Sequence, residues 1–329
     1  MTGLNSNNGN KIMTRVFVFP GQGSQTVGMG RELVDAFPEA RLVFEEVDET
    51  LRQNLSKVIF EGPEDQLRLT ENAQPALMAI SVAIVRVLEK EGNIRLPDIT
   101  SYVAGHSLGE YSALTVAGAL SLADTASLLK LRGTAMQIAV PVGQGAMAAL
   151  MGTNIKEAEE IAATAVEEGA EGEVCDVAND NAPGQVVVSG SKAAVERAME
   201  IGAKRGAKRS VILPVSAPFH CALMQPAADA MEEALATTTI SPPCVPIITN
   251  VSADEVRDPE TIRTNLVLQV TARVRWRESV MGLKKRGVDT LVEVGAGKVL
   301  SGLSRRIDRE ISPISVQGPE DIEAFLASL

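Results

Sequence analysis

A serine between two glycines is the feature of this chain best suited to chemistry. Ser107 lies in Gly105-His106-Ser107-Leu108-Gly109, the G-x-S-x-G spacing of a nucleophile elbow, between a strand-like run and a helix-like one. In such an elbow the serine occupies a strained turn, and the glycines allow strand and helix to pack closely. A serine at a helix start also meets backbone N–H groups that stabilise a developing oxyanion. The context therefore favours Ser107 as a nucleophile.

A nucleophilic serine needs a general base, and the chain has two histidines. His106 adjoins the serine, so we expect the turn to aim its side chain elsewhere, as a hydrogen-bonded support for the elbow. His220 lies in a proline-interrupted loop, where a histidine is often merely solvated, but as the unclaimed histidine it is the favoured base. No acidic residue stands out as a third member, and a backbone carbonyl could orient the imidazole equally well.

Arg132 is a cation on an apolar helix face that it shares with Leu128, Leu129 and Met136. A structural ion pair with a buried carboxylate is one explanation. The other is a carboxylate on the substrate, which a bidentate guanidinium fixes in a way that lysine does not. The sequence leaves both interpretations open.

The elements around these residues alternate between strand and helix, which implies a mainly parallel sheet covered by helices. The predicted strands are 15–19, 101–105, 246–249, 290–294 and 314–316. The predicted helices are 39–52, 74–90, 107–117, 122–140, 261–270, 276–286, 299–307 and 320–328.

The middle of the chain has a different pattern. Strands at 146–151, 174–178, 185–189 and 210–213, a turn at 179–184, and helices at 155–168 and 193–206 form βαββαβ, the ferredoxin-like order. We therefore expect an α/β protein with a large catalytic domain of residues 14–143 and 215–329. The ferredoxin-like subdomain would be inserted at 144–214, with the pocket between the two. Residues 1–13 are expected to be a disordered extension.

Composition excludes several function classes. With 329 residues, 45% hydrophobic, and a formal net charge of −11, the chain is typical of a globular enzyme and not of a nucleic-acid binder. The longest apolar stretch, 75–88, is broken by Arg86 and too short for a membrane span. Three widely spaced cysteines argue against a disulfide framework or zinc site and favour the cytoplasm. Basic clusters at 204–209, 273–277, 284–286 and 305–306 could dock an acidic partner.

Several motifs, in order along the chain, resemble the malonyl-CoA:acyl carrier protein transacylase family. They are FPGQGSQ at 19–25, QPAL at 74–77, GHSLGEYSAL at 105–114, LRG at 131–133 and APFH at 217–220, with further similarity at 265–276 and 293–295. The resemblance runs from about Val16 to the C-terminus. It implies an α/β-hydrolase-like core with a parallel sheet and a ferredoxin-like insert. It also implies a monomeric enzyme of fatty-acid synthesis, without metal or bound cofactor, that moves malonyl from malonyl-CoA to the phosphopantetheine thiol of acyl carrier protein.

The resemblance also assigns roles to the residues already singled out. Ser107 would carry the malonyl group and His220 would be its base. Arg132 would bind the malonyl carboxylate. The backbone N–H groups of Gln22 and Leu108 would form the oxyanion hole.

Further positions follow from the same motifs. Gln269 matches a glutamine whose main-chain carbonyl orients the histidine, and Asn179 matches an asparagine near the pocket mouth. Phe219 resembles that of malonyl-selecting members and would fill the space needed by a 2-methyl group. The chain departs from the family pattern at Cys221, where serine is frequent, and at 271–273, where Thr-Ala-Arg replaces the usual Asn-Pro.

Two other functions compete with this prediction. A serine esterase or thioesterase would use the same Ser–His pair with water as acceptor, although Arg132 argues against a simple lipase. A non-catalytic carrier-binding subunit would need a broken Ser–His pair, and the sequence keeps both residues.

Overall fold

The main sheet of the protein is six-stranded and carries the predicted strands. The computed structural model describes residues 14–329, so the extension predicted at 1–13 lies outside the described residues. The strand order is β10-β9-β1-β2-β7-β8, parallel except for the last pair. The strands are β1 (Arg15–Phe19), β2 (Tyr102–Gly105), β7 (Ile247–Ile248), β8 (Glu255–Val256), β9 (Thr290–Val294) and β10 (Ser312–Val316).

Both faces of this sheet are buried, because successive side chains of a strand point to opposite faces. In β1, Phe17 and Phe19 join the larger apolar core, while Val16 and Val18 join a second core on the other face. The helices around the sheet are α1 (Arg31–Ala36), α2 (Pro38–Leu51), α3 (Leu55–Glu61), α4 (Glu64–Arg68), α5 (Thr70–Gly92), α6 (Leu96–Ile99), α7 (Gly109–Val116), α8 (Leu122–Ala139), η1 (Ala222–Met224), α11 (Gln225–Thr237), α12 (Pro259–Gln269), α13 (Trp276–Lys285), α14 (Val299–Ile307) and α15 (Pro319–Ala327).

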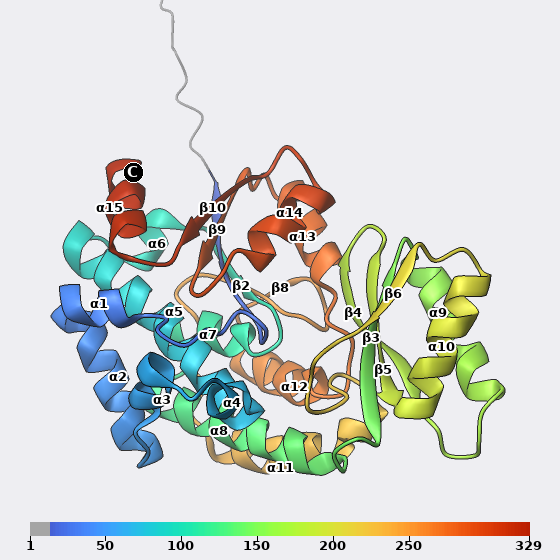
Figure 1. Ribbon diagram of the computed structural model, residues 1–329. Helices are drawn as coiled ribbons and strands as arrows, with labels where there is room; N and C mark the ends of the chain where they lie inside the picture. Colours follow the sequence, from blue (N-terminus) through green and yellow to red (C-terminus); the bar gives the residue numbers. More distant parts are fainter. Residues whose placement is uncertain (1–13) are drawn as a thin grey trace, which may run out of the picture.

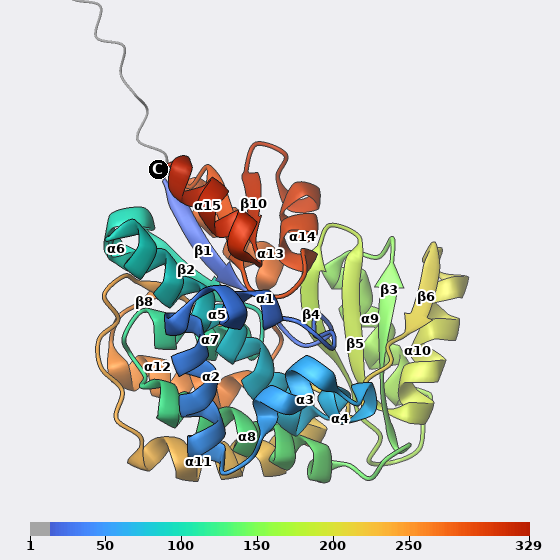
Figure 2. The ribbon, with the colours of Figure 1, turned by 60° about the vertical axis from the view of Figure 1, so that its left-hand side comes forward.

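The two cores are covered by different helices. α5, α8 and α11 enclose the larger core, and α13 and α14 enclose the smaller one (Figures 1 and 2). Helix α5 is buried nearly all round, as expected for a helix at the centre of a core. Within residues 14–329, no helix combines the length and the apolar character that a membrane crossing requires.

A second sheet of four antiparallel strands is formed by the middle of the chain. Its order is β4-β5-β3-β6, the arrangement of a ferredoxin-like βαββαβ unit, and α9 and α10 cover the face that points away from the main sheet (Figure 1). The elements are β3 (Gly145–Met151), α9 (Ile155–Glu167), β4 (Cys175–Ala182), β5 (Gln185–Ser191), α10 (Lys192–Lys204) and β6 (Arg209–Ile212). The predicted fold class is confirmed. The domain boundaries at 143/144 and 214/215 stay a prediction.

The predicted turn at 179–184 is too long, because the structure confines it to residues 183–184. The run Asn-Asp-Asn-Ala-Pro-Gly has the composition of a turn, but β4 continues to Ala182. Its backbone is held on both sides, because β4 pairs with β5 through two irregularities and Asp180 N–H also donates to the Val274 carbonyl at 3.0 Å. Tertiary pairing therefore overrides local composition here. Helix α11 was also not predicted, although Pro226 stands in its first turn, where proline is favoured.

Candidate active site

The turn between β2 and α7 has the geometry of a nucleophile elbow. Ser107 stands in it at φ 55°, a conformation that a non-glycine residue adopts only when its surroundings impose it. A Cβ at Gly105 would lie 1.9 Å from the backbone of Gly109, and a Cβ at Gly109 would lie 2.2 Å from the Phe19 carbonyl oxygen. Neither position has room for a side chain. The glycine spacing thus follows from the close packing of β1, β2 and α7.

Ser107 and His220 meet directly, although 113 residues separate them. The Ser107 Oγ lies 2.7 Å from His220 Nε2, and His220 Nδ1 lies 2.8 Å from the main-chain carbonyl oxygen of Gln269. A carbonyl oxygen only accepts, so Nδ1 carries the proton and Nε2 is free to accept from the serine hydroxyl. Burial, and next the charge of Arg132, lower the pKa of His220 to about 3, which keeps the ring neutral at neutral pH.

Arg132 completes this cluster from α8. Its Nη2 donates to Ser107 Oγ at 3.2 Å and to Gln269 Oε1 at 2.9 Å, and its Nη1 donates to Gln74 Oε1 at 2.8 Å. The side chain is 1% exposed, and its guanidinium carbon lies 5.7 Å from the centre of the Tyr111 ring. Among residues 14–329 no carboxylate forms an ion pair with it, so the structural ion pair that the sequence left open is absent there. The guanidinium is a buried cation held by neutral oxygens.

Two residues that sequence reasoning missed support the elbow and the arginine. Glu110 Oε2 accepts the Asn250 N–H at 2.9 Å and the Gln269 Nε2–H at 2.8 Å. The Asn250 side chain accepts the Ser107 N–H at 2.8 Å and donates to the Gly105 carbonyl at 2.6 Å. Burial raises the pKa of Glu110 to about 7, although the two N–H donors and the Arg132 charge act in the other direction.

The signal for Glu110 was present in the sequence. It is a charged residue in an apolar helix run, the same reason for which Arg132 was singled out. Gln74 lies in a motif that was noted, but its contact with Arg132 was not foreseen. Asn250 carries no local signal, since it follows an ordinary short strand.

The predicted oxyanion-hole amides belong to two segments that meet at the elbow. Leu108 begins the turn into α7, and the loop bearing Gln22 packs so closely that a Cβ at Gly21 would lie 2.8 Å from the His106 carbonyl oxygen. Within the described part of the chain neither the Gln22 nor the Leu108 N–H has a hydrogen-bond partner. The Gln22 side chain donates to Thr70 Oγ1 at 3.0 Å, which anchors the loop to α5.

The remaining predicted residues are His106, Phe219 and Asn179. His106 turns away from Ser107, as expected: its Nε2 donates to Asn181 Oδ1 at 2.9 Å. Phe219 is 8% exposed, directly before His220, and packs into the larger core. Asn179 is buried on β4 beside Val274, and among the described residues its side chain forms no hydrogen bond to Ser107 or His220. The neighbouring asparagine that contacts the elbow is thus Asn181.

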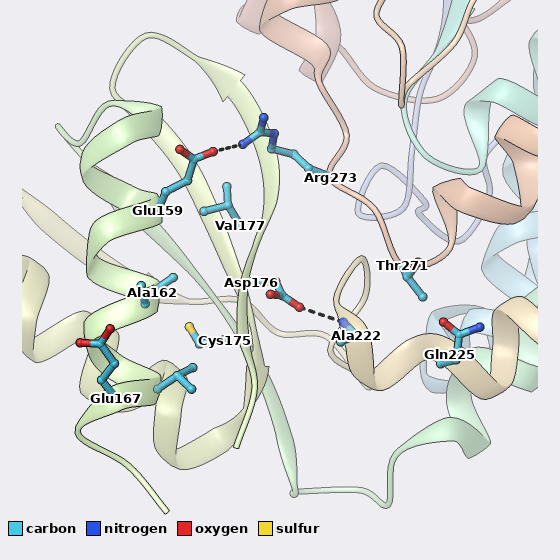
Figure 3. A pocket seen from close by; sticks show the side chains of 12 residues that line it. Glu159, Ala162, Glu167, Cys175, Asp176, Val177, Ala222, Gln225, Thr271 and Arg273 are labelled. Carbon is cyan, nitrogen blue, oxygen red and sulfur yellow. Dashed lines mark hydrogen bonds and ion pairs between the residues drawn. The ribbon is translucent and has the colours of Figure 1, made fainter. Parts of the chain in front are cut away.

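A cavity of about 760 Å³ lies between the four-stranded unit and the segments that follow His220 and Gln269, and none of Ser107, His220 and Arg132 lines it (Figure 3). α9 and β4 line one wall, and the segments that follow His220 and Gln269 line the other. Asp176 on β4 accepts the Ala222 N–H at 2.8 Å, and Arg273 pairs with Glu159 at 2.6 Å (Figure 3). The first contact ties the loop after His220 to β4, and the second ties the segment after Gln269 to α9.

Comparison with known proteins supports a family assignment. Residues 16–317 match the acyl transferase domain family. The chain is 45% identical over 313 residues to the malonyl CoA-acyl carrier protein transacylase of Bacillus subtilis, covering 95% of this chain and 96% of that protein. The acyl-carrier-protein-S-malonyltransferase of Bartonella henselae has a TM-score of 0.92 at 55% identity, covering 96% and 99%. A type II PKS acyl-carrier protein in complex with its malonyl-transacylase gives 0.91 at 40%, covering 96% and 100%.

Proposed function

Because the chain belongs to the acyl transferase family, as one of its malonyl-CoA–acyl carrier protein transacylases, we propose that Ser107 relays a malonyl group from malonyl-CoA to a carrier-protein thiol. One observation carries the proposal: Ser107 Oγ lies at once 2.7 Å from His220 Nε2 and 3.2 Å from Arg132 Nη2. A base and a buried cation thus converge on one hydroxyl. The base would activate the serine, and the cation would select an acyl group that carries a carboxylate.

The first half of the reaction acylates the enzyme. Ser107 Oγ attacks the thioester carbonyl carbon of malonyl-CoA while its proton passes to His220 Nε2. The Gln22 and Leu108 N–H groups stabilise the oxyanion. The intermediate collapses by breaking the C–S bond, and the departing CoA sulfur takes the proton from His220. Malonyl-serine, free CoA and neutral histidine remain.

The second half runs the same steps in reverse with another thiol. The phosphopantetheine thiol of the carrier gives its proton to His220 as its sulfur attacks the malonyl-serine carbonyl. The C–O bond to Ser107 breaks, and Oγ recovers the proton from His220. No net oxidation or reduction occurs, and the carrier leaves as its malonyl thioester.

Binding of the substrate carboxylate would also make His220 a stronger base. The Arg132 charge is one cause of the low pKa of His220. A malonyl carboxylate paired with Arg132 would neutralise that charge and so raise the pKa of the imidazole. Acetyl-CoA has no carboxylate and leaves the cation uncompensated, so it would meet a weaker base.

Hydrolysis is the function that this mechanism must exclude. A thioesterase would use the same serine and histidine and let water attack the acyl-serine. The family does not favour this alternative. The buried guanidinium without a carboxylate partner also fits a site that binds a malonyl group better than it fits a general esterase site.

The test is intact-protein mass measurement after incubation with malonyl-CoA. We expect one malonyl adduct on the wild type and none on Ser107→Ala. Holo acyl carrier protein should discharge the adduct, and apo carrier, which lacks the thiol, is the matched control. An adduct that persists on Ser107→Ala would move the nucleophile elsewhere, with Cys221 examined first. Equal discharge in buffer alone would indicate a thioesterase.

Location and assembly belong to the same proposal. We place the enzyme in the cytoplasm, because its three cysteines are free thiols, which a reducing compartment maintains. We also propose that it acts as a monomer, as the family resemblance led us to expect. Light scattering of the purified chain tests the monomer. The described residues contain no group of three or more histidine, cysteine or acidic side chains arranged to hold a metal ion.

A further inference from the structure

Glu110 is a buried carboxyl group that the proposed reaction does not use. It is 1% exposed, lies in the first turn of α7, and has no ion-pair partner among residues 14–329. Burying a carboxyl group costs free energy unless hydrogen bonds within the protein replace those that it makes with water. One of its oxygens, Oε2, receives both N–H donors, from Asn250 and from Gln269. This position therefore requires an acceptor of hydrogen bonds.

Glu110 Oε2 is one of two acceptors that determine which way the Gln269 amide faces. An amide side chain has one accepting and one donating end and can be turned around. Since Glu110 Oε2 accepts, Gln269 presents Nε2 to it, and Nε2 also donates to the Ser107 carbonyl at 3.1 Å. Gln269 Oε1 then points to Arg132 Nη2 at 2.9 Å. With the amide reversed, Gln269 would direct N–H groups at a guanidinium that itself only donates.

Arg132 depends on that orientation. Two side-chain carbonyl oxygens hold its guanidinium, from Gln74 on Nη1 and from Gln269 on Nη2. Its Nε has no partner among the described residues. We propose that Glu110 is a positioning residue that, through the Gln269 side-chain amide, aims Arg132 at the acyl carboxylate and so sets the preference for malonyl over acetyl. This inference rests on the proposed function.

The histidine is held by a different part of Gln269. His220 Nδ1 donates to the main-chain carbonyl of Gln269, whereas Glu110 and Arg132 contact the side chain. Breaking the side-chain link should therefore leave the base in place. The expected effect is selective: malonyl transfer falls while acetyl transfer persists.

The experiment compares Glu110→Met with Glu110→Gln. Methionine is of similar length but has no strong acceptor, so Gln269 Nε2 keeps only the Ser107 carbonyl as an acceptor and the orientation of the amide is held less firmly. Glutamine can place its carbonyl oxygen where Oε2 stands and keep both N–H donors. We expect the ratio of kcat/KM for malonyl-CoA over acetyl-CoA to fall about tenfold in Glu110→Met, the size of one lost hydrogen bond to a charged group. In Glu110→Gln the ratio should stay within about twofold of wild type.

Gln269→Met tests the same link from its other end and keeps the proposal falsifiable if Glu110→Met does not fold. It removes the side-chain amide but keeps the main-chain carbonyl, so it should lower the ratio about tenfold as well. Equal losses for both substrates in the folded variants would mean a merely structural role and overturn the inference. So would a Glu110→Gln variant as impaired as Glu110→Met. The wild-type malonyl adduct, measured in the same series, separates the two proposals: its absence refutes the function, whereas its presence with unchanged ratios refutes only the role of Glu110.

Discussion

Replacing Arg132 with alanine removes a cation that lies 1% exposed beside Ser107 and has no carboxylate partner within residues 14–329. In the proposed function that partner is the malonyl carboxylate. Losing a buried charge-assisted pair costs about 2–5 kcal/mol, or about 30- to 5,000-fold in kcat/KM. We expect a loss in this range for malonyl-CoA.

Acetyl-CoA should respond differently to the same change. It has no carboxylate to pair with Arg132, and removing the cation eliminates one cause of the low pKa of His220. Acetyl transfer should therefore persist or become faster. Arg132→Lys is the matched control, because it keeps the charge but cannot form the two-pronged contact, so it should fall between wild type and alanine.

The alanine variant will also be less stable. Gln74 Oε1 and Gln269 Oε1 lose their donor, and a buried unsatisfied acceptor costs roughly 1–3 kcal/mol. The assay therefore measures kcat/KM for both acyl-CoAs well below the melting temperature of each variant, with circular dichroism as a check of folding. An unchanged malonyl-to-acetyl ratio would refute carboxylate recognition by Arg132, whatever the change in stability.

Three further changes test other parts of the site. His220→Ala should slow acylation by about 10²- to 10⁴-fold without unfolding the protein, and a folded His106→Ala that is slower still would reverse the assignment of the two histidines. An unfolded Glu110 carboxyl ionises near pH 4.5, whereas burial holds the folded one protonated until about 7. Its contribution to the free energy of unfolding is therefore fully present below pH 4.5 and decreases by roughly 3 kcal/mol as the pH rises to 7. Urea titrations should show this decrease in wild type relative to Glu110→Gln, and identical pH dependences would contradict it. Lys204 and Lys285 are exposed cations with no ion-pair partner in the described part of the chain. If these lysines dock an acidic face of the carrier, Lys204→Glu and Lys285→Glu should raise KM for the carrier severalfold at low salt while leaving that for malonyl-CoA unchanged, and unaltered carrier kinetics would place docking elsewhere.

Local chemistry made much of this protein predictable from its sequence. The elbow at Ser107 can be recognised from adjacent residues: a strand, two glycines at −2 and +2, and a helix start. The βαββαβ order of the middle segment is written in its hydrophobic periodicity and was found with the correct fold class. His220 could be selected because the chain has just two histidines. These features depend on composition and short-range pattern.

Other parts of the site came from the family resemblance and not from physical reasoning. The acceptor for His220 Nδ1 is a main-chain carbonyl, and a main-chain group has no side-chain signature at its position. Gln269 was therefore named only because the motif matched. The departure from the family at 271–273 does not displace its carbonyl, which lies 2.8 Å from the imidazole.

Only the tertiary structure decided how the buried polar groups pair. Glu110 and Asn250 are 140 residues apart and meet because β7 lies beside β2 in the sheet. Whether Arg132 faces a carboxylate or neutral amides depended on which side chains α5 and α12 bring to it. The turn predicted at 179–184 is confined to 183–184 for the same reason, since backbone pairing with Val274 from a distant segment supports the longer strand. Hydrogen bonds between distant segments depend on the packed fold, and a one-dimensional pattern does not contain that information.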